Sequence, residues 1–290
     1  MKKVYELIGL IGRKSLLLRK IFAKVGLYEL IRKKNVSTII KLNTGELYKI
    51  NTLNWIGLQC FIYGSYDIEK KYEVKLLDIA KKIKSKCFLD IGTNHGYYSI
   101  KVANLLPDCK IYAFEPLSRN VEFIKENIRL NKLENIEIVK NVVSRERERV
   151  RVFYAGDENL GSSSCLNMFD TSDYEEVESL TIDDFVKNKN IFPDLVKIDV
   201  EGFELNVLEG MKNTLKYIRP ILFIEHNCLT LSQNRVFIED IVSFMKKYDY
   251  FPYDIDTKQE YKSSFGDRGL VLYIPSEKKE LCFENINFNL

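Results

Sequence analysis

The chain of 290 residues has few histidines and no clustered cysteines. Its two histidines are His95 and His226, and its six cysteines form no Cys-x-x-Cys pair. Structural zinc sites of the usual kind need such pairs, so the sequence excludes one. Because the cysteines are scattered among apolar neighbours in a large chain, we expect no secreted disulfide framework either, and we predict a reduced, cytoplasmic protein.

Long apolar runs and a strong excess of either charge are also absent. No apolar run approaches the roughly 18 residues of a membrane-spanning helix, so we do not expect an integral membrane protein. The 44 basic and 41 acidic residues give a net charge of +3, which is too balanced to indicate a nucleic-acid partner. A hydrophobic content of 46% with 29% charged residues excludes intrinsic disorder and low-complexity sequence.

Positive charge is concentrated in residues 1–34, which hold about ten lysines and arginines against Glu6 and Glu29. The rest of the chain is therefore net acidic. Apolar residues recur in this segment near helical spacing, which predicts a basic amphipathic helical extension. Two roles remain open for it: peripheral contact with an anionic membrane at its inner face, or packing on the main domain with its charges in solvent.

From residue 87 onward, strands and helices are expected to alternate, as they do in a parallel sheet covered on both faces. Short buried strands are predicted at 87–91, 110–115, 136–139, 195–199 and 220–225, with a late strand at 269–274. The helices between and after them are predicted at 97–106, 118–131, 205–217 and 236–248. The predicted fold class is α/β: a doubly wound, mostly parallel Rossmann-like sheet with an N-terminal helical extension.

A smaller N-terminal segment precedes the predicted sheet domain, and one insertion interrupts that domain. Residues 35–84 are expected to form a β-hairpin and a helix, and residues 85–290 the sheet domain with an insertion at about 144–191. The insertion follows the third strand, where such segments commonly build a lid or a substrate wall. Within it, Thr181 is expected to cap the start of a helix.

The loop after the first strand carries the most chemistry. It reads Asp-x-Gly-x-x-x-Gly from Asp90 through Gly92 to Gly96, which differs from the Gly-x-Gly-x-x-Gly of dinucleotide-binding enzymes. Ligands bind at the carboxyl ends of strands in open α/β sheets, and a glycine there lets a ligand approach the backbone. A carboxylate at Asp90 would repel a pyrophosphate, but it suits a ligand with ammonium and sulfonium charges. S-adenosylmethionine fits that description.

Polar residues also follow the next two strands. Glu115 ends the second strand, where an acidic side chain can accept hydrogen bonds from both ribose hydroxyls of a bound nucleoside. Asn141 follows the third strand, and its amide can either bond an adenine edge or form a turn. These positions extend the predicted cofactor site along the sheet edge.

Three ordered segments carry a resemblance to a known family. They are 88–99 (FLDIGTNHGYYS), 112–116 (YAFEP) and 195–202 (LVKIDVEG), with 180–185 and 220–225 in the same pattern. Together they resemble the FkbM-type methyltransferases over roughly residues 61–225, although His95 stands where an apolar residue is more common. The resemblance implies a class I S-adenosylmethionine-dependent methyltransferase fold that methylates hydroxyls of sugars or other natural products. The cofactor-binding residues predicted from these segments are Asp90, Gly92, Asn94, Gly96, Glu115 and Pro116, and Asn141 is added from its place after the third strand.

Candidates for the transfer step follow the fourth and fifth strands. A sugar hydroxyl is a poor nucleophile, so a positioned base would assist it. We predict His226 as this base, with Glu225 and Asp199 as further catalytic residues, and no metal. A second interpretation stays open, in which Asp199, Glu201 and Glu225 together hold Mg²⁺. In a third, Glu201 caps the helix that begins near residue 202.

The sequence therefore predicts an O-methyltransferase that acts on a small-molecule or glycan hydroxyl. Two alternatives remain: an N-methyltransferase, and a non-catalytic module that binds the cofactor or docks on a membrane. Lys197 lies inside the fourth predicted strand, and its amine is expected to reach solvent.

Overall fold

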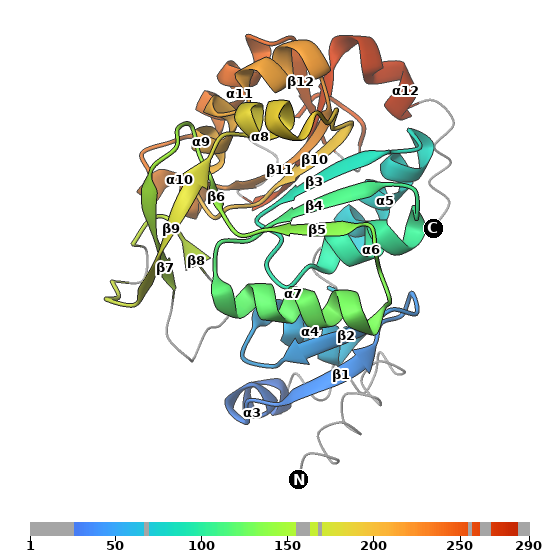
Figure 1. Ribbon diagram of the computed structural model, residues 1–290, viewed down its shortest axis with the longest axis vertical. Helices are drawn as coiled ribbons and strands as arrows, with labels where there is room; N and C mark the ends of the chain where they lie inside the picture. The colour runs from blue at the N-terminus through green and yellow to red at the C-terminus, as the bar shows by residue number, and fades with distance from the viewer. Residues whose placement is uncertain are drawn as a thin grey trace.

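The computed structural model describes residues 26–66, 70–154, 163–167, 170–254, 257–261 and 268–283. Its centre is a seven-stranded sheet (Figure 1). In order across the sheet the strands are β12 (Tyr250–Tyr253), β13 (Arg268–Pro275), β11 (Ile221–Asn227), β10 (Leu195–Ile198), β3 (Cys87–Ile91), β4 (Lys110–Phe114) and β5 (Ile136–Val139).

Five neighbouring strands of this sheet, from β11 to β5, run parallel. They are short and apolar, as expected of strands that are covered on both faces. β13 pairs antiparallel with β11, and β12 pairs antiparallel with β13. The predicted α/β class with a mostly parallel sheet is therefore confirmed.

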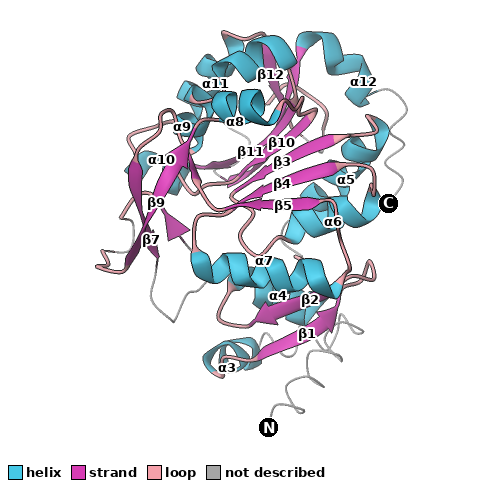
Figure 2. Ribbon diagram, in the orientation of Figure 1, coloured by secondary structure: helices cyan, strands magenta, loops and turns pink. Residues whose placement is uncertain are grey.

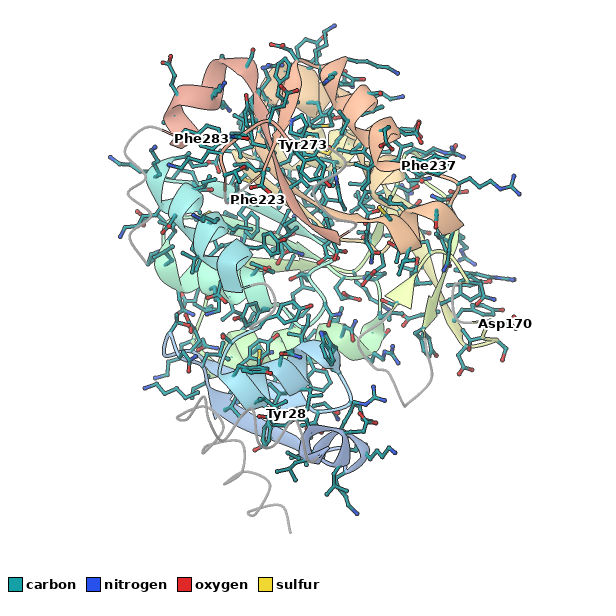
Figure 3. The ribbon with its side chains drawn as sticks, turned by 180° about the vertical axis from the view of Figure 1, so that it is seen from behind. Tyr28, Asp170, Phe223, Phe237, Tyr273 and Phe283 are labelled. Carbon is teal, nitrogen blue, oxygen red and sulfur yellow. The ribbon has the colours of Figure 1, made fainter. Side chains whose placement is uncertain are left out.

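Helices cover both faces of the sheet (Figure 2). On one face lie α5 (Lys70–Lys82), α6 (Tyr97–Leu105) and α12 (Lys279–Phe283), and on the other α8 (Ile182–Lys189), α9 (Glu204–Glu209) and α11 (Ile238–Lys246). Side chains alternate between the two cores along each strand. Phe223 packs in the first core and Tyr273 of the neighbouring strand in the second; both are labelled in Figure 3.

The helix predicted over 205–217 is broken. α9 ends at Glu209, and a π-helical segment, η2 (Thr214–Ile218), follows. The Asp183 carboxylate of α8 accepts the backbone N–H groups of Asn213 and Thr214, each at 2.8 Å. A new segment therefore begins there, because a neighbouring helix caps it.

An N-terminal unit precedes the sheet. It consists of α3 (Leu27–Lys33), the hairpin of β1 (Ser37–Lys41) and β2 (Leu47–Asn51), and α4 (Trp55–Tyr63). The predicted hairpin is confirmed, whereas α4 was not predicted. The unit packs on α7 (Ser118–Leu130), where Asn127 Oδ1 accepts the Lys49 backbone N–H at 2.6 Å. Of the basic extension predicted over 1–34, residues 1–25 lie outside the described residues.

The insertion after β5 forms a second sheet in the order β6 (Val142–Val143), β9 (Tyr174–Leu180), β7 (Arg149–Tyr154) and β8 (Ser163–Ser164). Thr181 caps α8 as predicted, because its side chain accepts the Asp184 backbone N–H. After β11, a short helix that was not predicted, α10 (Cys228–Gln233), leads away from the sheet edge. In the part of the chain that the structure describes, every helix is too short or too polar to cross a membrane.

Candidate active site

A cavity of about 420 Å³ lies where the parallel strands end. The carboxyl ends of β3, β4, β10 and β11 contribute to its lining, together with the insertion and the N-terminal unit. Its size lies in the range of small-molecule sites. It is also at the sheet edge where ligands bind in open α/β folds.

Gly92 gives the loop after β3 its shape. Its φ of 78° is left-handed, and a Cβ at this position would lie 1.8 Å from the Asp199 carbonyl oxygen. The backbone N–H groups of Gly92 and Thr93 donate to the Phe114 carbonyl at 3.1 and 3.0 Å. The loop is therefore pressed between the ends of β4 and β10, and no side chain fits at position 92.

Asp90 has a different place from the one expected. It is fully buried beneath the loop and is not part of the cavity lining. Its Oδ2 atom accepts from Thr93 Oγ1 at 2.7 Å, from the Ser99 N–H at 3.1 Å and from Ser99 Oγ at 2.6 Å. The expectation that this carboxylate faces the positive charges of the ligand is corrected: Asp90 holds the loop and the first turn of α6 together.

Glu115 is buried at the end of β4 and lines the cavity. Its Oε1 atom accepts the Leu117 N–H at 3.0 Å and Asn120 Nδ2 at 3.1 Å. Burial raises the pKa of this carboxyl to about 7, although the hydrogen bonds from Leu117 and Asn120 oppose the shift. Glu115 thus lines the cavity at the position for which ribose binding is predicted.

The other predicted cofactor residues do not all line the cavity. Asn94, Pro116 and Asn141 line the cavity together with Gly92 and Glu115. Asn141 also donates from Nδ2 to the Glu178 carbonyl at 2.9 Å. Gly96 lies outside the lining, at the N-cap of α6, with a left-handed φ of 83°. Cofactor contact by these residues stays a prediction.

Three carboxylates meet next to the Gly92 loop, at the ends of β10 and β11. Asp199, Glu201 and Glu225 each place an oxygen within 4.8 Å of the others; we call them the carboxylate trio. Lys197 of β10, two residues before Asp199, approaches it with Nζ 2.9 Å from Oδ2. Its ammonium also lies 5.0 Å from the ring centre of Tyr98.

Lys197 is a site residue that the sequence reasoning assigned to solvent. Its side chain is only 2% exposed and lines the cavity. The signal for it was the spacing Lys-x-Asp in a strand, because residues two apart share a face. A buried ammonium needs a carboxylate beside it, and Asp199 occupies that position.

Glu201 does not cap the following helix, contrary to one of the interpretations. Its φ of 50° turns the chain so that its side chain lines the cavity. The nearby backbone N–H groups of Val200 and Gly202 instead donate to Glu204, at 3.2 and 3.1 Å. Burial raises the pKa of Glu204 to about 7.

Neither histidine is placed as a catalytic base. His226 is fully buried outside the cavity lining, with Nε2 3.1 Å from the Tyr273 hydroxyl. His95 stacks on Phe123 at 4.2 Å between ring centres. Burial lowers the pKa of both imidazoles to about 3, so each is neutral near pH 7 and a weak base. The prediction of His226 as the general base is corrected for these reasons.

The N-terminal unit supplies part of the cavity wall that the motifs did not indicate. Arg32 of α3, Trp55 at the start of α4, and Tyr66 all line the cavity. Asn54 connects the unit to the glycine loop: it caps α4 by accepting the Gly57 N–H, and its Nδ2 lies 3.4 Å from Asn94 Oδ1. The Asn54 cap was the available sequence signal for this helix.

Residues 90–252 match the methyltransferase FkbM domain, which is more than half of the chain. The chain belongs to the FkbM methyltransferase family. The predicted resemblance is thus confirmed, and with it the methyltransferase class and S-adenosylmethionine as the cofactor of that class. Arg32, Trp55 and Tyr66 come before the matched residues.

Individual relatives are distant. The chain is 24% identical over 209 residues to a tRNA/tmRNA (uracil-C(5))-methyltransferase of Campylobacter lari, covering 69% of this chain and 49% of that protein. It is 31% identical over 71 residues to the ribosomal RNA small subunit methyltransferase G of Bifidobacterium longum, covering 23% and 32%. The chain thus spans half or less of the length of these two curated relatives. The solved FkbM methyltransferase of Methylobacillus flagellatus KT is 18% identical, with a TM-score of 0.45, over 65% of this chain and 43% of that one.

The cavity fits S-adenosylmethionine on the residues that line it. Gly92 lines the cavity and has no side chain, so a ligand can approach the backbone of the loop there. Glu115 offers carboxylate oxygens for ribose, and the carboxylate trio complements ammonium and sulfonium charges. A pyrophosphate in the same place would face four carboxylates.

Proposed function

We propose that this protein transfers the methyl group of S-adenosylmethionine to a hydroxyl of a sugar, a glycan or a related natural product. One observation carries the proposal: a single cavity holds Glu115 and the Gly92 loop at the ends of β4 and β3, and the carboxylate trio lies next to the loop, at the ends of β10 and β11. The first part suits a nucleoside, and the second suits the hydroxyl that receives the methyl group.

The cofactor supplies an electrophilic methyl group on sulfur. The protein's own residues bind and align the two reactants, which is a large part of catalysis for an in-line displacement. Asp199 would accept the proton of the acceptor hydroxyl while the hydroxyl oxygen bonds to the methyl carbon and the bond from that carbon to sulfur breaks. Lys197 holds the Asp199 carboxylate in place, and Glu225 accepts a hydrogen bond from the same or a neighbouring hydroxyl.

A polyhydroxylated acceptor is favoured over a nucleic acid by charge. Four carboxylates line the cavity, against the cations of Arg32 and Lys197. Carboxylates accept hydrogen bonds from hydroxyls, but they repel phosphates at short range. The exposed ring of Trp55 adds an apolar surface on which a sugar ring can stack.

Two measurements test this proposal. Calorimetry with S-adenosylhomocysteine should show binding, and a labelled-methyl assay across glycan and sugar-nucleotide acceptors should place the label on oxygen. Absence of binding at millimolar ligand would refute the cofactor assignment. Label recovered only on nitrogen would point to the N-methyltransferase alternative.

Affinity for the cofactor is expected to depend on pH through Glu115. Its pKa is raised to about 7 by burial, so below this pH the carboxyl is protonated and one oxygen no longer accepts from ribose. The affinity for S-adenosylhomocysteine should therefore rise as the pH is increased from 6 to 8. By linkage, the contribution of Glu115 to the free energy of unfolding is largest at low pH and is lost as the pH rises through about 7.

Calorimetry of the wild type and of Glu115→Gln between pH 6 and 8 checks this expectation. The glutamine is neutral throughout, so the variant should bind more weakly with a nearly flat profile. An equal pH dependence in both proteins would assign the titration to another group.

The carboxylate trio also has the oxygen donors that Mg²⁺ prefers. We expect methyl transfer without a metal, because the Lys197 ammonium already neutralises Asp199 at 2.9 Å. Treatment with EDTA should leave turnover unchanged, and added Mg²⁺ should not raise it. Loss of turnover with EDTA and recovery with Mg²⁺ would show that the trio binds a metal.

Contact of the basic segment with a membrane stays a prediction. If the lysines and arginines before residue 35 bind anionic lipid, the protein should bind vesicles containing phosphatidylserine at low salt and dissociate at high salt. Cosedimentation of the full chain and of a chain lacking residues 1–25 measures this. Equal binding by both proteins would assign lipid contact to another surface.

A further inference from the structure

Arg32 brings a cation into the cavity from outside the residues that match the family. Among the cations of the described lining, Lys197 is paired with a carboxylate of the cavity itself, Asp199. The ion-pair partner of Arg32 within the described residues is Glu29, three residues earlier on α3, at 3.3 Å. The Glu29 side chain is 53% exposed, and such surface pairs contribute little. An anionic ligand would therefore stabilise the Arg32 guanidinium more than the Lys197 ammonium.

The order of the strands gives the order of groups along the cavity. From β5 through β4 to β3, the lining passes from Asn141 to Glu115 to Gly92. A nucleoside held by Asn141 and Glu115 directs the rest of the cofactor, its amino-acid end, toward the glycine loop. The N-terminal unit meets the loop there, since Asn54 Nδ2 lies 3.4 Å from Asn94 Oδ1.

Three backbone N–H groups of the glycine loop already donate hydrogen bonds within the protein. The N–H groups of Gly92 and Thr93 donate to the Phe114 carbonyl, and that of Gly96 donates to the Thr93 carbonyl. They are not available to bind a carboxylate as the N–H groups of an open phosphate-binding loop would be. A side-chain donor at this end of the cavity can bind the carboxylate of the cofactor's amino-acid part in their place.

We propose that Arg32 binds the carboxylate of the methionine part of S-adenosylmethionine. This inference rests on the proposed function and adds a cofactor contact from the N-terminal unit. A guanidinium matches a carboxylate with two parallel hydrogen bonds, which gives orientation as well as affinity. The cofactor's ammonium and sulfonium then face the carboxylate trio, so each charged group of the ligand meets the opposite sign.

Calorimetry with two nucleosides tests the proposal without knowledge of the acceptor. S-adenosylhomocysteine carries the amino-acid carboxylate, and 5′-methylthioadenosine has the same nucleoside and sulfur without it. Arg32→Gln should weaken S-adenosylhomocysteine binding by about tenfold to 100-fold, as expected for a lost hydrogen-bonded charge pair. It should leave the affinity for 5′-methylthioadenosine unchanged.

Lys33→Gln is the matched control, because it removes the same charge from an exposed neighbour on the same helix. It should bind both ligands as the wild type does. If Arg32→Gln is not obtained folded, Arg32→Lys keeps the charge without the planar fork, and it should weaken S-adenosylhomocysteine alone to a smaller extent.

The outcomes separate this inference from the proposed function. Unchanged binding of S-adenosylhomocysteine by the Arg32 variants, or an equal loss for both ligands, would overturn the role of Arg32. Equal affinity of the wild type for the two ligands would also overturn the role of Arg32, but it would leave the cofactor assignment intact. A wild type that binds neither ligand would instead reject the proposed function.

Discussion

Replacement of Asp199 with asparagine is expected to lower the rate of methyl transfer by about 10²- to 10⁴-fold, the usual contribution of a positioned base. The amide keeps the shape of the side chain but cannot accept the hydroxyl proton. Binding of S-adenosylhomocysteine should be largely retained, because Glu201 and Glu225 still face its ammonium and the loop and Glu115 still hold its nucleoside. Single-turnover rates with labelled S-adenosylmethionine, together with calorimetry, measure the two effects separately.

The control for the Asp199→Asn variant tests whether its effects come from the buried ammonium of Lys197. Without the Asp199 carboxylate, the buried Lys197 ammonium loses its ion pair at 2.9 Å, and this destabilises the fold. The double variant Asp199→Asn with Lys197→Met removes both charges and should recover stability in urea unfolding while turnover stays low. Recovery of turnover in the double variant would show that the loss came from the Lys197 charge and not from the missing carboxylate. Wild-type turnover in Asp199→Asn would remove this residue from the mechanism.

The fold was largely predictable because its strands are short, apolar and separated by amphipathic helices. The strands at Cys87–Ile91 and Lys110–Phe114 were expected to within a residue, since strands of a covered parallel sheet stand out as apolar runs. The helix expected over 205–217 was wrong as one element, because its interruption depends on Asp183 of α8. A contact between residues about 30 apart leaves no mark in the local pattern.

Site residues were predictable where a strand end alone decides their position. Glu115, Asp199 and Glu225 all follow or end parallel strands, and the structure brings them to one cavity. The failure at His226 has a simple cause: neighbours in a strand point to opposite faces. Glu225 faces the cavity, so His226, the next residue of β11, points away from it and bonds Tyr273.

Other residues of the site depend on tertiary structure alone. Arg32 and Trp55 reach the cavity because the N-terminal unit packs on α7 and against the glycine loop. No sequence pattern between residues 32 and 92 indicates that the N-terminal unit contacts the glycine loop. Asp90 was predicted to contact the cofactor, but its burial and its bonds to Thr93 and Ser99 make it a support of the loop.

Replacement of Gly92 with alanine is expected to give the largest loss of stability of any single methyl addition in the loop. The new Cβ would lie 1.8 Å from the Asp199 carbonyl oxygen, which is backbone and cannot rotate away, and the residue would keep a left-handed φ of 78°. The loop would have to move off β10, which would also disturb the Asp199 backbone. We expect the free energy of unfolding in urea to fall by about 3–5 kcal/mol, and binding of S-adenosylhomocysteine to be lost.

Gly96→Ala is the matched control for this change, because Gly96 has nearly the same backbone conformation without the close contact. Its φ is 83°, but the nearest atom to an added Cβ is the Ile124 side chain at 3.4 Å. Only the left-handed conformation should cost stability here, about 1–2 kcal/mol, and S-adenosylhomocysteine should still bind. Equal losses for the two variants would mean that backbone conformation alone explains the glycine at position 92. A larger loss for Gly92→Ala would assign the difference to the close approach of the loop and β10, on which the shape of the cofactor site depends.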